Sequence, residues 1–217
     1  MNQRNKNCLH KHQSGVGLID VMVAVFIFSV GILAITALQF LSKQSNFEAI
    51  QRSNAALLSY EMFERMRMNS LYQAASTAVG AATVSTLIYY VPGGDNTINK
   101  TTPSSKPTPD CSAATCTQAE LADWDIYEFQ QMMLGSAETK SDDDTVDLGG
   151  LVDPTACISG PTAGDGMYTI SIVWRGQVKL PQDSSVPNFN TCGGNQYDDE
   201  PDDYAFRRMI ETTSYLH

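Results

Sequence analysis

Histidine, a common side chain for acid–base chemistry near neutral pH, occurs only near the two ends of this sequence of 217 residues. The three histidines are His10, His12 and His217. Ser-His-Asp triads, histidine-activated cysteines and histidine-ligated zinc all need this side chain beside other reactive groups. Asp123 and Asp125 could form an acid–base pair, but residues two apart on a helix point in different directions. We therefore expect no enzyme activity, no cofactor and no metal.

The cysteines offer a different chemistry. Cys8 lies near the N-terminus, and Cys111, Cys116, Cys157 and Cys192 follow later in the chain. Four cysteines in an exported segment are typical of two disulfides, and three pairings are possible. We favour Cys111–Cys116, before a predicted helix, and Cys157–Cys192, on either side of a predicted strand. A zinc site is the alternative, although the C-x4-C spacing followed by two single cysteines differs from paired C-x2-C motifs.

Acidic residues outnumber basic ones, with 24 Asp and Glu against 14 Lys and Arg and a net charge of −10. We expect no nucleic acid partner, because DNA and RNA are captured by clustered Lys and Arg. Two acidic runs, residues 142–147 and 198–203, offer oxygen ligands that Ca²⁺ could use. Neither run matches the EF-hand pattern, so we interpret both as solvated charges, with calcium binding as the alternative.

These groups must be positioned by a helix and several strands. Thr117 and Glu120 have the spacing of a capping box, so a helix is predicted over residues 118–134, and Gly135 would end it. Its predicted core face consists of Ala122, Ile126, Phe129 and Met133, widened by Leu121 and Trp124.

Strands are predicted at residues 83–91, 167–175 and 204–215, and the third could pair antiparallel with the second. In the second strand, alternate residues from Tyr168 to Trp174 are apolar, which predicts burial on one face. Residues 92–116 are rich in Pro, Gly, Ser and Thr and predict a surface loop. These elements predict an α+β fold in which a long N-terminal helix packs on a small antiparallel sheet with one short extra helix.

The N-terminal part has the charge pattern of a membrane anchor. Residues 1–15 carry three basic side chains and no acidic one, so their removal would change the net charge from −10 to −13. Residues 21–42 are uncharged and long enough to span a bilayer, with the basic flank in the cytoplasm. A buried core helix is the alternative. Helix-forming residues continue to residue 72, and the apolar residues beyond 43 suggest contacts on more than one side.

Between the basic flank and the apolar run lies the stretch GVGLIDV, from Gly15 to Val21. It resembles the class III signal of type IV prepilins, in which Gly precedes Phe and a Glu stands at the fifth mature position. The resemblance implies cleavage after Gly15, N-methylation of Val16, and pairing of Asp20 with the N-terminal amine of a neighbouring subunit. Val16 replaces the usual Phe, and Asp20 replaces the usual Glu, with a carboxylate one methylene shorter. Alternatively, Asp20 lies at the lipid headgroups, where its charge costs little.

The rest of the chain resembles the PilV group of minor pilins, also called type IV pilus modification proteins. The likeness lies in the cysteine-bracketed loop, the Thr-Gln-Ala-Glu-Leu-Ala start of the predicted helix, and the sequence SVGIL within the apolar run. Several later residues also follow one another in the same order as in that group. They are Cys157, Tyr-Thr-Ile at 168–170, Val-Trp-Arg at 173–175, Cys192, and Phe-Arg-Arg at 206–208. The resemblance spans most of the chain and leaves the loops at 92–110 and 135–155 uncovered.

This resemblance implies the pilin-like fold in three parts. Residues 1–15 would be a cleaved leader, residues 16–72 a long helix that crosses the membrane over 16–42, and residues 73–217 a disulfide-stapled head outside the cytoplasm. The implied function is that of a minor pilin in pilus assembly or priming, with adhesion as a further role. The implied partners are prepilin peptidase, the inner-membrane assembly platform, and other major and minor pilins.

The expected location is first the inner membrane, with a cytoplasmic N-terminus, and then the pilus fibre at the cell surface. Two alternatives stay open. One is a minor pseudopilin of type II secretion, and the other, from a different class, is a membrane-tethered periplasmic enzyme or sensor.

Overall fold

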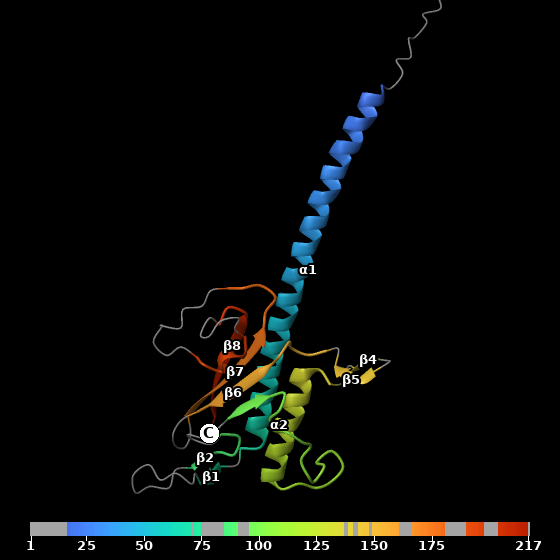
Figure 1. Ribbon diagram of the computed structural model, residues 1–217. Coiled ribbons are helices and arrows are strands. Elements are labelled where there is room, and N and C mark those ends of the chain that lie inside the picture. Colours follow the sequence, from blue (N-terminus) through green and yellow to red (C-terminus); the bar gives the residue numbers. More distant parts are fainter. Residues whose placement is uncertain are drawn as a thin grey trace, which may run out of the picture. The chain divides into compact units, whose positions relative to one another are not determined.

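The computed structural model divides the chain into two units, residues 1–45 and 46–217. Helix α1 (Leu18–Met68) begins in the first unit and ends in the second, which also holds every described strand (Figure 1). The described residues are 17–70, 72–74, 85–90, 96–136, 139–140, 143–147, 149–160, 166–180, 190–197 and 204–216.

A four-stranded antiparallel sheet organises the second unit, in the order β3–β6–β7–β8. Its strands are β3 (Thr97–Asn99), β6 (Thr155–Ser159), β7 (Gly166–Arg175) and β8 (Arg207–Leu216). β7 and β8 pair along their whole lengths, which confirms the predicted strand at 167–175 and its antiparallel partner. β3 lies within the segment predicted as a loop, and β6 was not predicted, because both strands are too short to show clear alternation.

Two small two-stranded sheets flank the central one. β1 (Tyr72–Ala74) pairs with β2 (Ser85–Leu87), and β4 (Thr139–Lys140) pairs with β5 (Asp143–Asp147). β2 is shorter than the strand predicted at 83–91, because the backbone turns after Leu87. β5 lies in the first acidic run, so residues 143–147 of this run form a paired strand.

Helix α2 (Gln118–Leu134) confirms the predicted boundaries and both predicted caps. The Thr117 hydroxyl accepts a hydrogen bond from the Glu120 N–H at 3.3 Å, and the Glu120 carboxylate accepts one from the Thr117 N–H at 2.7 Å. At the other end, Gly135 adopts the left-handed conformation, and its N–H donates to the Met132 carbonyl.

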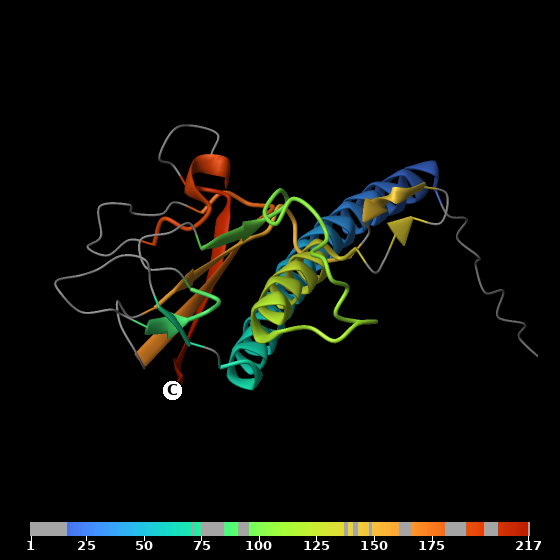
Figure 2. The same cartoon turned by 90° about the horizontal axis from the view of Figure 1, so that it is seen from below.

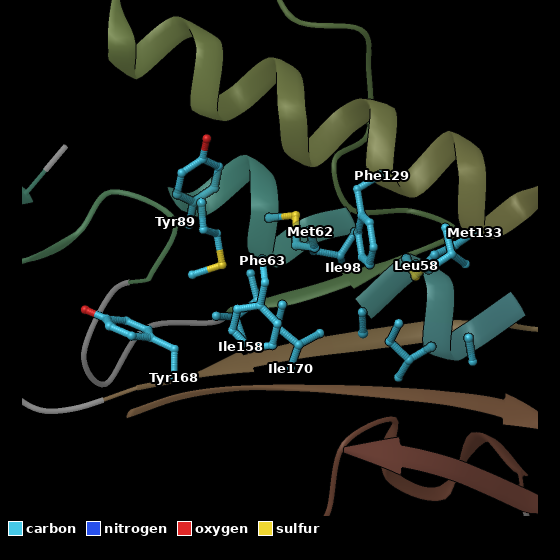
Figure 3. Packing of buried hydrophobic residues seen from close by; sticks show 14 of the residues in the cluster. Leu58, Met62, Phe63, Tyr89, Ile98, Phe129, Met133, Ile158, Tyr168 and Ile170 are labelled. Atoms are coloured by element: carbon cyan, nitrogen blue, oxygen red, sulfur yellow. The ribbon is translucent and has the colours of Figure 1, made fainter. Parts of the chain in front are cut away.

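The main core lies where residues 46–68 of α1 and the helix α2 cover one face of the central sheet (Figure 2). The buried residues of α1 form one stripe at helical spacing, and Phe63 and Met62 point toward the strands and α2 (Figure 3). They are Gln51, Ala55, Leu58, Ser59, Met62, Phe63 and Met66. Within this unit α1 therefore has one buried face, and the predicted contacts on more than one side stay a prediction. Ile50 and Leu57, at 57% and 66% exposure, lie outside the stripe.

The opposite face of β7 is also covered, which corrects the prediction of burial on one side only. Ser171 and Val173 are buried there. Val173 packs against Cys192, which precedes the short 3-10 helix η1 (Gly194–Tyr197), and against Tyr197, the last residue of that helix. The Tyr197 hydroxyl donates to the Asp153 carbonyl at 2.7 Å, which fixes this segment over the strand.

The end of α2 depends on two glycines whose backbones touch. Gly135 and Gly150 both have positive φ, at 73° and 79°. A Cβ added at Gly135 would lie 2.0 Å from the carbonyl carbon of Gly149. The Leu151 N–H donates to the Met133 carbonyl at 2.8 Å, so the two segments are held together and cannot separate freely.

We expect Gly135→Ala to lower the free energy of unfolding by about 3 kcal/mol, because a clash with backbone adds to the cost of positive φ. Gly194→Ala is the matched control, since Gly194 also has positive φ (52°) but open space around its Cα. It should cost only about 1 kcal/mol. Denaturant unfolding can be followed by the fluorescence of the two buried tryptophans, Trp124 and Trp174. Equal losses in the two variants would contradict the clash.

Candidate functional site

Asp20 lies in the first turn of α1, three residues after Gly17. Its carboxylate accepts a hydrogen bond from the Gly17 N–H at 3.1 Å, so it satisfies one of the unpaired donors at the helix start. A negative charge at this position also interacts favourably with the helix dipole. The side chain is exposed, and the carboxylate is therefore accessible to another molecule. Gly15 and Val16, the predicted cleavage and methylation positions, lie outside the described residues, as do all three histidines.

The apolar stretch that follows Asp20 is a candidate membrane span. α1 is long and apolar enough to cross a bilayer, and none of its most apolar window is buried. A core helix of a soluble protein would bury much of such a surface, so exposure argues against the core-helix alternative. The helix continues through Ser29 and Gly31, and the Ser29 hydroxyl donates to the Val25 and Phe26 carbonyls within the same helix.

The four later cysteines form two disulfides, in the pairing favoured from the sequence. Cys111–Cys116 closes the loop before α2, with a Cα–Cα distance of 5.6 Å. Cys157–Cys192 connects β6 with the segment before η1, at a Cα–Cα distance of 5.9 Å. Because all four thiols are oxidised in this arrangement, they cannot form the alternative zinc site.

A partly buried polar cluster joins α1 and α2 inside the second unit. Arg65 donates to Asp125 and to Glu128, each at 2.8 Å, and to Glu61 at 3.1 Å. The Tyr89 hydroxyl donates to the other oxygen of Asp125 at 2.5 Å. Sequence patterns do not place Asp125 in the core, because the predicted inner face of α2 is apolar. Leu121, predicted for that face, is instead 37% exposed.

Electrostatics fix the protonation of Arg65 and Tyr89 in this cluster. Burial opposes the charge of Arg65, but hydrogen bonds with its three carboxylate partners outweigh burial and raise the pKa of Arg65. Burial, together with the hydrogen bond to Asp125 and its charge, raises the pKa of Tyr89 well above its usual range. Arg65 therefore remains a cation and Tyr89 a hydrogen-bond donor at neutral pH. The cluster acts as a fixed connection between the two helices.

We expect Arg65→Ala to lower the free energy of unfolding by about 3 kcal/mol, because it leaves the buried Asp125 carboxylate without its cation. Arg67→Ala is the control on the same helix. Arg67 pairs with Glu64, but both side chains are about half exposed, so its loss should cost less than about 1 kcal/mol. Denaturant unfolding of the full chain in detergent micelles measures both variants. An effect of Arg65→Ala no larger than that of Arg67→Ala would contradict this role.

Among the residues that the structure describes, no three His, Cys, Asp or Glu side chains are placed to share a metal ion. The second acidic run, residues 198–203, lies outside this part of the chain, so its calcium alternative stays a prediction. Only backbone is described for the first acidic run.

The residues and folds described here define an α+β protein with a long apolar N-terminal helix and a disulfide-containing four-stranded antiparallel sheet. Comparisons with known protein families, with curated proteins and with solved structures gave no significant match. A proposal for its function therefore depends on these residues and their arrangement.

Proposed function

We propose that this chain is a minor pilin, a structural subunit of a type IV pilus that resembles the PilV group. One observation carries the proposal. Asp20 lies in the first turn of a single uninterrupted helix whose apolar first part has exposed side chains and whose second part belongs to the head. A carboxylate at the edge of a membrane-length apolar helix has a desolvation cost when apolar surroundings cover it. Pairing with the N-terminal amine of a neighbouring subunit would offset that cost.

In this proposal the apolar helix has two successive environments. It first crosses the inner membrane, with the basic flank in the cytoplasm. After cleavage following Gly15 and methylation of Val16, the same side chains leave the lipid and pack against other pilin helices in the fibre. The exposed Ile50 and Leu57 would extend this packing surface along α1. The disulfides suit a head that is exported to an oxidising compartment.

The mass of the intact protein, purified from its native membrane or fibre, tests this proposal directly. A species that begins at methylated Val16 is the expected result. A chain that still begins at Met1 would contradict it and would favour the tethered enzyme or sensor. The sheared-pilus fraction should contain the protein, whereas a minor pseudopilin of type II secretion should be absent from that fraction.

A further inference from the structure

A polar hollow lies on the face of the central sheet opposite α1 and α2. Its volume is about 410 Å³, within the range of about 300–1,000 Å³ that is typical of small-molecule sites. Its floor comes from β3, β6 and β7, and its rim comes from residues 190–194. The lining residues with side-chain hydroxyl or amide groups are Thr97, Asn99, Thr155, Ser159, Ser171, Asn190 and Thr191. None of the lining residues carries a charged side chain.

The strand register sets the floor residues in rows across the sheet. Thr97 lies opposite Cys157, and Cys157 lies opposite Ser171. Asn99 and Thr155 form the next row. Adjacent strands are about 4.8 Å apart, so the hydroxyls of Thr97 and Ser171 lie about two strand spacings apart, on either side of Cys157. In the second row the Thr155 hydroxyl is already bonded to Tyr197 and Gln196. Such a surface can make several hydrogen bonds to one ligand with many hydroxyl groups.

The rim is fastened to the floor by contacts that leave the hollow preformed. The Asn190 amide nitrogen donates to the Ser171 hydroxyl at 2.8 Å, and the Asn190 carbonyl oxygen accepts from the Cys192 N–H at 2.8 Å. The buried Arg207 donates to the Cys192 carbonyl at 3.2 Å, and the Cys157–Cys192 disulfide connects rim to floor covalently. A preformed site loses less entropy when it binds a ligand.

The chemistry of the lining selects the ligand. Hydroxyl and amide groups both donate and accept hydrogen bonds, as the hydroxyls of a sugar do. Glu211, beside the hollow, contacts both Asn190 and Ser171, and the whole chain is acidic. Arg207, whose guanidinium lies 3.4 Å from the Asn190 side-chain oxygen, offsets the charge of Glu211, so neither sign of charge dominates beside the hollow. We propose that the hollow binds a neutral saccharide.

The same face continues toward an exposed aromatic side chain. Thr169 and Thr213 form the row after Ser171 and Glu211, and their hydroxyls hydrogen-bond at 3.0 Å. The following row consists of Met167 and Tyr215, which are 57% and 55% exposed. Four residues of strand span about 13 Å, so an oligosaccharide that leaves the hollow along the sheet could reach Tyr215. Aromatic rings with a polar tip suit the mixed apolar and polar surface of a sugar.

The test uses the full chain reconstituted in phosphatidylcholine vesicles, because several copies on one vesicle strengthen a weak interaction by avidity. The vesicles are applied to an array of neutral, sialylated and sulfated oligosaccharides. We expect binding to a restricted set of neutral saccharides, with competition by the same saccharide in solution. Binding to none of the neutral saccharides, or stronger binding to the sulfated ones, would overturn the inference.

The site is then assigned with paired variants. The double variant Thr97→Val/Ser159→Ala removes two lining hydroxyls and should weaken binding about tenfold. The control Ser105→Ala/Thr115→Val removes two exposed hydroxyls elsewhere and should leave binding unchanged. If the first variant does not fold, Thr191→Val on the exposed rim should reduce binding by a factor of about three. Unchanged binding in the hollow variants would overturn the assignment. The mass of the mature protein tests the pilin proposal separately, so the two can fail independently.

Discussion

Asp20→Ala is expected to leave leader removal intact and to reduce incorporation of this chain into the fibre by about tenfold or more. The physical reason is that a carboxylate–amine pair between apolar helices is poorly screened, and loss of one partner leaves the other charge uncompensated. Since about 1.4 kcal/mol corresponds to a factor of ten, even a modest pair produces this effect. The measurement is the amount of mature protein in the sheared fibre fraction relative to the amount in the membrane fraction.

Two further variants separate charge from helix capping. The Asp20 carboxylate also accepts a hydrogen bond from the Gly17 N–H, so alanine removes both interactions. Asp20→Asn keeps an acceptor oxygen but removes the charge, and it should be as defective as alanine. Asp20→Glu keeps the charge, matches the usual prepilin residue, and should assemble at least as well as the original. Normal incorporation of Asp20→Ala would instead favour a carboxylate that merely lies at the lipid headgroups.

The second large effect concerns the Cys157–Cys192 disulfide. We expect Cys157→Ala/Cys192→Ala to lower the free energy of unfolding by about 4 kcal/mol, because this bridge closes a long loop in the unfolded chain. The sequence separation is 35 residues. The variant would also release the rim segment, residues 190–194, from β6. Loss of the disulfide should therefore loosen the second core cluster around Val173 and Tyr197.

Cys111→Ala/Cys116→Ala provides the comparison. Its sequence separation is only 5 residues, so the chain-entropy argument gives about 2 kcal/mol. Both double variants are measured by denaturant unfolding in the same micelles, with tryptophan fluorescence as the signal. Thiol counting on the original protein, purified without reductant and then denatured, should show no free cysteine among these four. A smaller loss for the Cys157–Cys192 variant than for the other would contradict the loop-length argument.

Local signals in the sequence were sufficient for the elements that depend on nearby residues. The capping box at Thr117 and the glycine at 135 define α2, because a helix end is decided by groups three or four residues apart. The alternating pattern from Tyr168 to Trp174 gives β7 for a similar reason. The long α1 follows from a run of helix formers without Pro or Gly after the apolar stretch.

The sequence predicted the Cys157–Cys192 pairing and the pairing of β7 with β8, but not the other contacts between distant segments. Asp125 joins Arg65 and Tyr89 only because α2 packs beside the end of α1, which no local pattern encodes. Burial of the outer face of β7 depends on residues 190–197, which return to the sheet far along the chain. Short strands such as β3 are stabilised mainly by their partner, so their own composition is a weak signal.

By itself, the sequence determined the reactive groups that this protein has and where its charge lies. It carries histidine only near its ends, a basic segment before one acidic residue, a membrane-length apolar run, and four later cysteines. The tertiary structure alone decided several contacts between side chains that no local pattern specifies. It brought Arg65 beside Asp125 and Tyr89 between two helices, and formed a polar hollow from residues of three strands and a distant loop. These outcomes depend on long-range packing, whose energy comes from surfaces that become neighbours only when the chain has folded.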